Sequence, residues 1–298
     1  MKILLLGKNG QVGWELQRSL APLGEVVALD FDSPGTLQAD FSKPDSLAAT
    51  VQAVAPDLIV NAAAYTVVDK AESEPDLARR LNATAVGVIA REAAARQTLL
   101  VHYSTDYIFN GEGESPWIED AAPQPLSVYG QTKLEGENLI RESGCPHLIL
   151  RTSWVYGARG GNFIKTMLRL AKERDQLTVI DDQIGAPTGA DLLADLTAHM
   201  VRTAQGGPSV HGTYHAAAAG YTSWYAYAQH VIEFARAAGQ PIQVKPEAIL
   251  AVPTTHFPTP ARRPLNSRLD TTKLRNTFKL TLPHWEAGVE RMLREFLG

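Results

Sequence analysis

The sequence predicts an α/β protein in which a doubly wound, parallel sheet is joined to a smaller lobe of mixed structure. In the first half of the chain, short apolar runs alternate with stretches whose apolar residues recur at helical spacing. A glycine-rich turn joins the first apolar run to the first helical stretch, and the alternation becomes less regular beyond Arg151. Strands that alternate with helices are typical of a parallel sheet with helices on both faces.

The first predicted strand, residues 3–6, leads into a turn with glycines at positions 7, 10 and 13. Val12, Leu16 and Leu20 then share one face of a helix predicted over residues 10–20. A glycine turn at this place lets a pyrophosphate approach the backbone, and the N–H groups at the helix start can bind it. The sequence therefore predicts a Rossmann-type dinucleotide site, although the spacing is G-x-x-G-x-x-G rather than G-x-G-x-x-G. The residues expected to form it are Gly7, Gly10, Gln11, Val12 and Gly13.

The remaining elements of the first half follow the same alternation. Further strands are predicted at residues 25–29, 57–61, 99–103 and 147–150. Helices are predicted between them at residues 47–54, 76–96 and 129–142. Residues 109–128 contain several glycines and prolines, and we expect a long loop there, beside the functional site.

The second half is expected to supply most of the smaller lobe. Helices are predicted at residues 162–174, 191–204, 223–238 and 283–296, with a strand at 177–180 and an irregular proline-rich segment at 246–264. Residues 1–155 should form the dinucleotide-binding domain, completed by parts of residues 176–240. Residues 156–298 should form mainly a substrate-binding lobe that is interleaved with this domain.

Composition excludes several classes of protein. Hydrophobic residues make up 45% of the 298 residues, which is enough for a substantial core. The formal net charge of -4 argues against a nucleic-acid partner, and no apolar run approaches the roughly 18 residues of a membrane span. Cys145 is the single cysteine, so no internal disulfide can form, and we expect a cytoplasmic protein.

Asp30 ends the second predicted strand, where a carboxylate can bind the ribose hydroxyls of a dinucleotide. A carboxylate there repels a 2′-phosphate, although Lys8 could offset the repulsion. We therefore expect NADH to be usable and leave NADPH open; an exposed aspartate at a strand end is the alternative interpretation. Further cofactor contacts are expected from residues that loop packing would explain as well, namely Asp40, Phe41, Ala62, Ala63 and Ala64.

Thr105, Tyr129 and Lys133 are the candidate catalytic residues. Thr105 follows the predicted strand 99–103, where its hydroxyl could bind a substrate carbonyl, and the adjacent Ser104 is a rival for that role. Tyr129 and Lys133 are four residues apart and share one face of a helix. An ammonium group near a phenol favours the phenolate, so we expect Lys133 to lower the pKa of Tyr129 and to hold a nicotinamide ribose. The combination predicts ketone reduction with Tyr129 as proton donor.

Several motifs together resemble the extended short-chain dehydrogenase/reductase superfamily and, within it, the dTDP-4-dehydrorhamnose reductase family. The resemblance extends from residue 1 to about residue 297. It implies reduction of the C4 ketone of dTDP-4-dehydro-β-L-rhamnose by NADPH or NADH, the last step in making dTDP-L-rhamnose for bacterial surface polysaccharides. The motifs that carry it lie at residues 102–109, 128–137, 151–156, 162–168, 185–189 and 258–264.

The resemblance also implies roles for individual residues. Thr105, Tyr129 and Lys133 fall on the family's catalytic positions, and Thr105, Asp106 and Trp154 fall on its sugar-contacting positions. Packing in the core is an equally good interpretation of Trp154. The residues at or near cofactor contacts of the family are Gly10, Gln11, Val12, Asp30, Asp40, Phe41, Ala63, Ala64 and Tyr103.

Three further expectations concern residues outside this set. Arg262 and Arg263 could bind the substrate diphosphate, because guanidinium groups suit phosphate geometry, or could be an exposed basic pair. Asn82 falls where the superfamily kinks a helix or holds a water. The resemblance also implies a homodimer held by Mg²⁺; its candidate ligands are Glu15, Asp191 and Glu295, although the family pattern has Glu at position 191.

Two alternative functions remain open from the sequence. A related nucleotide-sugar enzyme, such as a 4-epimerase, could use the same scaffold. A 4,6-dehydratase is disfavoured, because Tyr107 stands where such an enzyme would carry a glutamate. A non-catalytic regulatory relative is the second alternative, and the presence of Thr105, Tyr129 and Lys133 argues against it.

Overall fold

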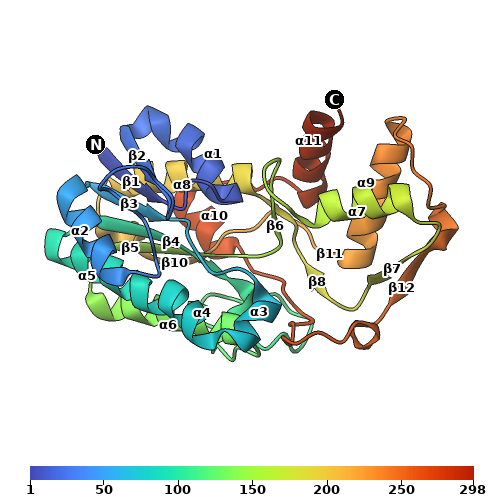
Figure 1. The fold of residues 1–298 in the computed structure, drawn as a ribbon, viewed down its shortest axis with the longest axis horizontal. Helices are drawn as coiled ribbons and strands as arrows, with labels where there is room; N and C mark the ends of the chain where they lie inside the picture. Colours follow the sequence, from blue (N-terminus) through green and yellow to red (C-terminus); the bar gives the residue numbers. More distant parts are fainter.

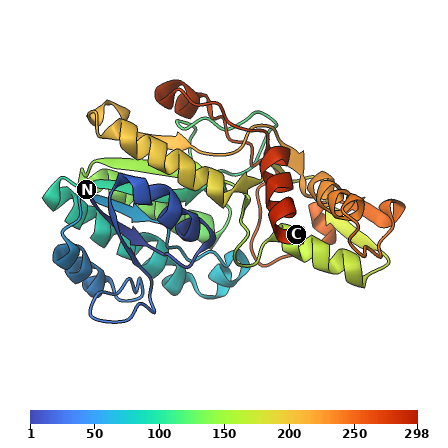
Figure 2. The ribbon, with the colours of Figure 1, turned by 90° about the horizontal axis from the view of Figure 1, so that it is seen from above.

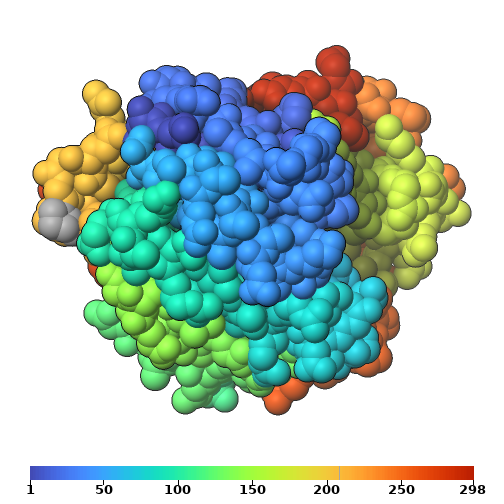
Figure 3. Space-filling view, turned by 60° about the vertical axis from the view of Figure 1, so that its left-hand side comes forward, coloured from blue at the N-terminus to red at the C-terminus, as the bar shows by residue number. Residues whose placement is uncertain are grey.

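A computed structural model describes residues 1–298, apart from the side chain of Pro208, which is grey in Figure 3. Six parallel strands form the central sheet in the order β10-β5-β4-β3-β1-β2 (Figure 1). This agrees with the predicted doubly wound sheet. The strands are β1 (Lys2–Leu6), β2 (Glu25–Leu29), β3 (Leu58–Asn61), β4 (Leu99–Thr105), β5 (His147–Thr152) and β10 (Gly212–His215).

Helices cover both faces of this sheet (Figures 1 and 2). The first face carries α1 (Gln11–Leu20), α8 (Ala190–Ala204) and α10 (Thr272–Phe278). The second face carries α2 (Pro44–Val54), α5 (Ala85–Arg96) and α6 (Val128–Ser143). Among the described residues, none of the helices is both long and apolar enough to cross a membrane.

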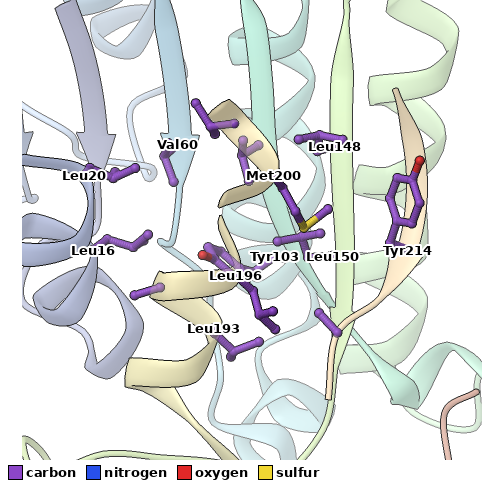
Figure 4. Packing of buried hydrophobic residues seen from close by; sticks show 14 of the residues in the cluster. Leu16, Leu20, Val60, Tyr103, Leu148, Leu150, Leu193, Leu196, Met200 and Tyr214 are labelled. Atoms are coloured by element: carbon purple, nitrogen blue, oxygen red, sulfur yellow. The ribbon is translucent and has the colours of Figure 1, made fainter. Parts of the chain in front are cut away.

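Apolar side chains fill the space between the sheet and the first face of helices (Figure 4). Burial of each large side chain stabilises the fold by about 1.5–3 kcal/mol. The apolar residues at helical spacing in α1 make this contact, because Leu16 and Leu20 are both fully buried against the strands. The residues labelled in Figure 4 are Leu16, Leu20, Val60, Tyr103, Leu148, Leu150, Leu193, Leu196, Met200 and Tyr214.

The helix predicted over residues 76–96 is interrupted. It consists of α4 (Pro75–Arg79), one π-helical turn (Arg80–Thr84) and α5. Asn82 lies in this turn, where its Oδ1 accepts a hydrogen bond from Tyr65 N (2.9 Å) and its Nδ2 donates to Tyr65 O (3.1 Å). Tying the side chain to a neighbouring loop distorts the helix at the expected residue. A Cβ on Gly136 of α6 would lie 2.2 Å from the Asn82 carbonyl oxygen, so α6 packs directly on this turn.

The C-terminal lobe lies beside the sheet and contains α7 (Phe163–Glu173), α9 (Trp224–Ala237) and α11 (Trp285–Leu297) (Figures 1 and 2). Its core is rich in aromatic side chains, including Tyr227 and Trp285. Short two-stranded ladders complete the lobe: β7 (Leu177–Ile180) with β12 (Ile249–Val252), β8 (Ile184–Gly185) with β11 (Thr222–Ser223), and β6 (Val155–Tyr156) with β9 (Thr188–Gly189).

Several elements were not anticipated from the sequence. β10 adds a sixth strand to the sheet next to β5, and β12 lies in the proline-rich segment that was expected to be irregular. The short helices α3 (Val68–Ser73) and α10 were also missed. As expected, no helix or strand lies between Ile108 and Val128 in the described chain, where Trp117 makes one isolated bridge to Leu269.

Candidate active site

A cavity of about 1050 Å³ opens at the carboxyl ends of the central strands. Its wall includes the glycine turn after β1, the residues after β2, β3 and β4, and the start of α6. Trp154 and Trp224 close it from the C-terminal lobe. In open α/β sheets, this edge is where ligands bind.

The glycine turn packs so closely on neighbouring backbone that Gly7 and Gly13 cannot carry side chains. Gly7 has a φ of 87°, and a Cβ on it would lie 2.6 Å from Ala63 N. A Cβ on Gly13 would lie 1.9 Å from Gly7 O, so Gly13 packs directly against the turn. It does not line the cavity. Gly10 precedes α1 without a side-chain cap, which leaves the start of the helix able to bind an anion. This cradle fits a dinucleotide pyrophosphate.

Asp30 lies at the end of β2 next to the glycine turn. Its Oδ2 accepts a hydrogen bond from Asn9 N (3.0 Å), and its Oδ1 accepts one from Phe31 N (2.8 Å). Asp30, Asn9 and Phe31 all line the cavity. The carboxylate is therefore held at the cavity edge by backbone N–H groups, in the place predicted for a ribose contact.

The other residues predicted to contact the coenzyme border the cavity in different ways. Asp40 lines the cavity but accepts hydrogen bonds from Ser42 N (3.0 Å) and Ser42 Oγ (2.6 Å), and these bonds lower its pKa. Phe41 is only 4% exposed and packs in the core under α2, and it also borders the cavity. Phe31, which was not predicted, is the exposed aromatic ring at this end, whereas Ala62, Ala63 and Ala64 line the wall as predicted.

The start of α6 brings Tyr129 and Lys133 to the cavity. Ser127 caps the helix, with its Oγ accepting a hydrogen bond from Gly130 N (3.2 Å). A Cβ on Gly130 would lie 2.2 Å from Tyr107 O, so the glycine allows α6 to pack against the segment that follows β4. Tyr129, Lys133 and Thr105 consequently lie in one wall of the cavity.

The structure separates the roles of Ser104 and Thr105. Ser104 Oγ donates a hydrogen bond to Glu137 Oε1 (2.5 Å), a buried carboxylate that is also paired with Arg151 Nη2 (2.8 Å). Thr105 Oγ1 instead donates to Asp106 Oδ1 (3.1 Å) inside the cavity wall. Ser104 is therefore engaged in a buried ionic network, and Thr105 has the hydroxyl that can meet a substrate.

Tyr129 keeps its proton at neutral pH. Burial raises the pKa of its phenol to about 12; the nearby Thr105 hydroxyl lowers it and the charge of Asp106 raises it. Lys133 is not among the groups that shift this pKa here, and its Nζ donates to Tyr103 O (2.6 Å), so a lowering of the Tyr129 pKa by Lys133 stays a prediction. The phenol of Tyr129 is accordingly a proton donor in this structure.

Lys133 and Asp106 both titrate near neutral pH. Burial lowers the pKa of Lys133 to about 8, against the negative charge of Glu137, which raises it. Burial raises the pKa of Asp106 to about 7, against hydrogen bonds from Ser267 and Thr105 that lower it. Asp106 Oδ2 has no hydrogen-bond partner among the described residues. Strongly shifted groups in a cavity are typical of a catalytic site.

Trp154 is held rigidly at the opposite side of the cavity. Its backbone is left-handed, with a φ of 49°, which is strained for a residue with a bulky side chain. The ring stacks on Trp224, with 3.6 Å between ring centroids, and a Cβ on Gly185 would lie 2.6 Å from it. Trp224, missed in the sequence, lies 70 positions away and could not be connected with Trp154 from spacing.

The two arginines predicted to bind a diphosphate do not line the cavity. Arg263 pairs with Asp69, with its Nη2 2.7 Å from Oδ2 and its Nη1 3.0 Å from Oδ1. Arg262 is exposed. Hence the structure leaves Arg262 free and gives Arg263 a protein partner.

The residues predicted to bind Mg²⁺ do not form a metal site in the chain. Arg291 Nη1 lies 2.9 Å from Asp191 Oδ2, and Arg291 Nε lies 3.3 Å from Glu295 Oε1, so an arginine is bound where a cation was expected. Glu15 pairs with Arg18 (3.5 Å). Among the described residues, no group of three or more His, Cys, Asp or Glu side chains is suitably placed for a metal ion. In the single chain these carboxylates are thus paired with arginines, and the metal site between two chains stays a prediction.

Known proteins with similar sequences cover the whole chain. Residues 1–297 match the family described as RmlD substrate binding domain. The chain is 57% identical over 295 residues to dTDP-4-dehydrorhamnose reductase of Escherichia coli (strain K12), covering 99% of this chain and 98% of the relative. It is 46% identical over 302 residues to the enzyme of the same name from Burkholderia thailandensis, covering 100% of both chains.

Solved structures give the same result. A dTDP-4-dehydrorhamnose reductase from Bacillus anthracis, in complex with NADP, is 34% identical, with a TM-score of 0.87 over 99% of both chains. A UDP-glucose 4-epimerase from Thermus thermophilus, 19% identical with a TM-score of 0.79 over 100% of this chain and 99% of the other, shares the fold. On the sequence identities, this chain belongs to the dTDP-4-dehydrorhamnose reductase family.

Proposed function

We propose that this chain reduces the C4 ketone of dTDP-4-dehydro-β-L-rhamnose to dTDP-β-L-rhamnose, with Tyr129 as the proton donor. The observation that carries the proposal is the single cavity that contains both the glycine turn and Thr105, Tyr129 and Lys133. The names of the relatives support the dTDP-sugar substrate, and the NADP complex of the Bacillus anthracis relative supports a nicotinamide coenzyme.

The coenzyme site extends along the carboxyl ends of the first three strands. The backbone at Gly7, Gly10, Gln11 and Val12 would hold the pyrophosphate, and Asp30 would bind the adenosine ribose. Ala62, Ala63, Ala64 and Tyr103 would line the rest of the site, with Lys133 at the second ribose. When bound, NADPH or NADH supplies the hydride.

Tyr129 and its neighbours handle the proton. The raised pKa of Tyr129, about 12, keeps the phenol protonated at neutral pH, so it can protonate the oxygen of the ketone as that oxygen gains negative charge. The Thr105 hydroxyl would orient the same oxygen. Lys133, with a pKa of about 8, can change its protonation state near neutral pH beside the site. One hydride on carbon and one proton on oxygen convert the ketone into an alcohol.

The sugar would lie between the catalytic wall and the lobe. Trp154, clamped between Trp224 and Gly185, presents a fixed aromatic surface to an apolar sugar face. Asp106 has a free buried oxygen that can bind a sugar hydroxyl. Arg262 would approach the diphosphate only if the exposed segment that carries it moves towards the cavity, and Arg263 would first have to leave Asp69.

The test is turnover of the named substrate. Purified protein is incubated with dTDP-4-dehydrorhamnose and either NADH or NADPH, coenzyme absorbance is followed, and the product is identified by NMR. Net oxidation of coenzyme that matches the formation of dTDP-L-rhamnose is expected. Interconversion of 4-epimers without net coenzyme oxidation would identify an epimerase instead, and binding without turnover would indicate a non-catalytic relative.

Three broader features also remain proposals. Residues 1–155, together with parts of 176–240, are proposed to act as the coenzyme domain, because β10 and α8 pack on its sheet. A homodimer is proposed without the metal, and its test is the mass in solution measured by light scattering. A cytoplasmic location is proposed from the nature of the coenzyme and the nucleotide sugar.

A further inference from the structure

Asn61, His102 and Lys133 form a buried chain of polar groups beneath the cavity. Asn61 ends β3 and is 1% exposed, and His102 lies within β4 and is 0% exposed. Asn61 Nδ2 lies 3.0 Å from His102 Nδ1, and His102 Nε2 lies 3.3 Å from Lys133 Nζ. Of the three residues, Lys133 alone lines the cavity, so it is the one that can meet a ligand directly.

The backbone fixes which way the Asn61 amide faces. Ala63 N donates a hydrogen bond to Asn61 Oδ1 (3.0 Å), so Oδ1 is directed at Ala63 and the Nδ2 donor is directed at His102. His102 Nδ1 must then be an acceptor. Burial holds the pKa of His102 well below its usual value, and a charge on Lys133 would lower it further, so the ring is neutral in either state of Lys133. A neutral imidazole with an acceptor at Nδ1 carries its proton on Nε2.

The Nε2–H group of His102 therefore faces Lys133 Nζ. An ammonium group has three donors and no acceptor, so a charged Lys133 would place N–H against N–H at this contact. A neutral amine has a lone pair that can accept from Nε2–H and still donate to Tyr103 O, 2.6 Å from Nζ. The contact thus favours the amine over the ammonium.

We propose that Asn61 and His102 are positioning residues that hold the imidazole as its Nε2–H tautomer and thereby favour the amine form of Lys133. The consequence for turnover rests on the proposed reductase function, whereas the tautomer and the titration of Lys133 do not. In this arrangement the amide of Asn61 controls the protonation of a lysine that it does not touch. Lys133 is then able to gain and lose a proton in the pH range where the enzyme works.

The charged groups near Asn61, His102 and Lys133 have different effects on the protonation of Lys133. Glu137 on α6 favours the ammonium form of Lys133, but it is shared among Arg151 (2.8 Å), Arg141 (3.1 Å) and Ser104. The other titratable groups of the catalytic wall are Tyr103, Asp106, Tyr107 and Tyr129. Among the described hydrogen bonds, none joins one of these side chains to His102. His102 is the nearest polar side chain on the sheet side of Lys133.

The first experiment reads the tautomer directly in the unmodified protein. NMR of protein with ¹⁵N-labelled histidine rings distinguishes Nδ1–H from Nε2–H by the nitrogen shifts, and no substrate is needed. His102 is expected to be neutral and protonated at Nε2 from acidic to alkaline pH. His215, which is also fully buried but contacts Phe109, provides a reference for a buried ring. A His102 ring protonated at Nδ1 would overturn the proposal.

The second experiment reverses the tautomer with Asn61→Asp. The carboxylate keeps an acceptor for Ala63 N and offers another to His102 Nδ1, so the ring proton moves to Nδ1 and Nε2 becomes an acceptor for a Lys133 ammonium. The Lys133 titration, followed by ¹³Cε NMR, should move up by about one pH unit or more. An unchanged tautomer with an unchanged titration would contradict the proposal.

Asn82→Asp is the matched control for added charge. Asn82 is also 1% exposed and contacts α6 through Thr132 Oγ1 (3.2 Å), but it does not touch His102. This variant should leave the His102 tautomer at Nε2–H and move the Lys133 titration by less than Asn61→Asp does. Equal shifts in the two variants would mean that charge alone acts on Lys133, and the proposal would fall.

The pH profile of turnover tests whether Asn61 and His102 act on the reaction through Lys133. At saturating substrate and coenzyme, Asn61→Asp should move the limb of the kcat profile that reports Lys133 upward by the same shift as in the NMR titration, with KM little changed. A purely structural role of Asn61 would lower kcat at all pH values without moving the limb, which would overturn the proposal. Absence of turnover in the unmodified protein would instead refute the reductase function, and the NMR results would stand.

Discussion

The two ends of the cavity differ in what sets the pKa values of their charged residues. At the catalytic end, Thr105, Asp106 and Lys133 are 5%, 3% and 2% exposed, and the loss of water moves the pKa of Asp106 and Lys133 towards neutrality. At the end beside the glycine turn, Phe31 is 67% exposed, and hydrogen bonds from Ser42 lower the pKa of Asp40. Burial therefore moves pKa values towards neutrality at one end, whereas hydrogen bonds keep a carboxylate charged at the other.

The most severe test of this difference is the loss of the proton donor. Tyr129→Phe removes only the phenol oxygen, and kcat should fall about 10²- to 10⁴-fold, the usual contribution of a general acid. Steady-state kinetics with NADPH and dTDP-4-dehydrorhamnose measure the effect, and a thermal melt shows whether the fold is retained. Tyr107→Phe is the control, because this ring contacts Tyr129 edge to face at 5.7 Å, and it should lose far less activity. Equal kcat in Tyr129→Phe and the parent would remove Tyr129 from the mechanism.

A pair of variants sharpens the comparison within the catalytic end. Thr105→Val removes the hydroxyl in the cavity, so kcat/KM should fall by about 1.5–3 kcal/mol of transition-state stabilisation, roughly 10- to 150-fold. Ser104→Ala breaks the hydrogen bond to buried Glu137, so it should lower the free energy of unfolding by about 1–3 kcal/mol and leave kcat unchanged. Urea unfolding and initial rates distinguish the two effects. A loss of activity in Ser104→Ala and a loss of stability in Thr105→Val would instead mean that the Ser104 hydroxyl contacts the substrate.

The adjacent hydroxyls also show what the sequence could and could not predict. Patterns that are local in the chain, such as the glycine turn after β1 and the spacing of Tyr129 and Lys133, placed the sheet and most of the cavity wall correctly. Ser104 and Thr105 could not be separated, because their roles depend on Glu137, which is 33 positions from Ser104. The burial that raises the pKa of Tyr129 and the contact of Lys133 Nζ with Tyr103 O are tertiary features, which the spacing of the two residues could not indicate.

The C-terminal lobe was harder to predict than the sheet. Its strands are short and its ladders pair distant segments, such as β7 with β12, so no regular alternation marks them in the sequence. β10 has the polar sequence Gly-Thr-Tyr-His, and it joins the sheet through pairing with β5 rather than through an apolar pattern. The metal prediction was not supported for a related reason, since Arg291, which pairs with Asp191 and Glu295, has no local signal that links it to residue 191.

A pH-dependent effect on stability would test whether burial is the cause at the catalytic end. The folded pKa of Asp106 is about 7 and its ordinary value is 3.8, so between these values the folded protein holds a proton that the unfolded chain has released. This group therefore makes the fold less stable as pH rises from about 4 to 7, and its effect levels off above pH 7. Asp106→Asn removes that dependence.

The melting temperature of Asp106→Asn minus that of the parent should accordingly increase between pH 5 and pH 7 and then remain constant. Differential scanning calorimetry at four or five pH values measures this difference. A difference that is the same at every pH would mean that Asp106 is not destabilised by burial, and the contrast between the two ends of the cavity would weaken.

The smallest effect is expected at Asp30, at the end of the cavity beside the glycine turn. Asp30→Asn removes a charge that would repel a 2′-phosphate, and charges about 4 Å apart in water interact by only about 1 kcal/mol, so the preference for NADPH over NADH should rise about fivefold. Asp30→Ala removes the same charge and both acceptors for Asn9 N and Phe31 N, of which Asp30→Asn keeps one. It should therefore shift the preference equally while weakening the binding of both coenzymes more. The ratio of kcat/KM values for the two coenzymes is the measurement. Because the site is exposed to water, the shift should shrink as salt is added. A preference that ignores salt, or that changes in Asp30→Ala alone, would mean that turn geometry and not charge selects the coenzyme.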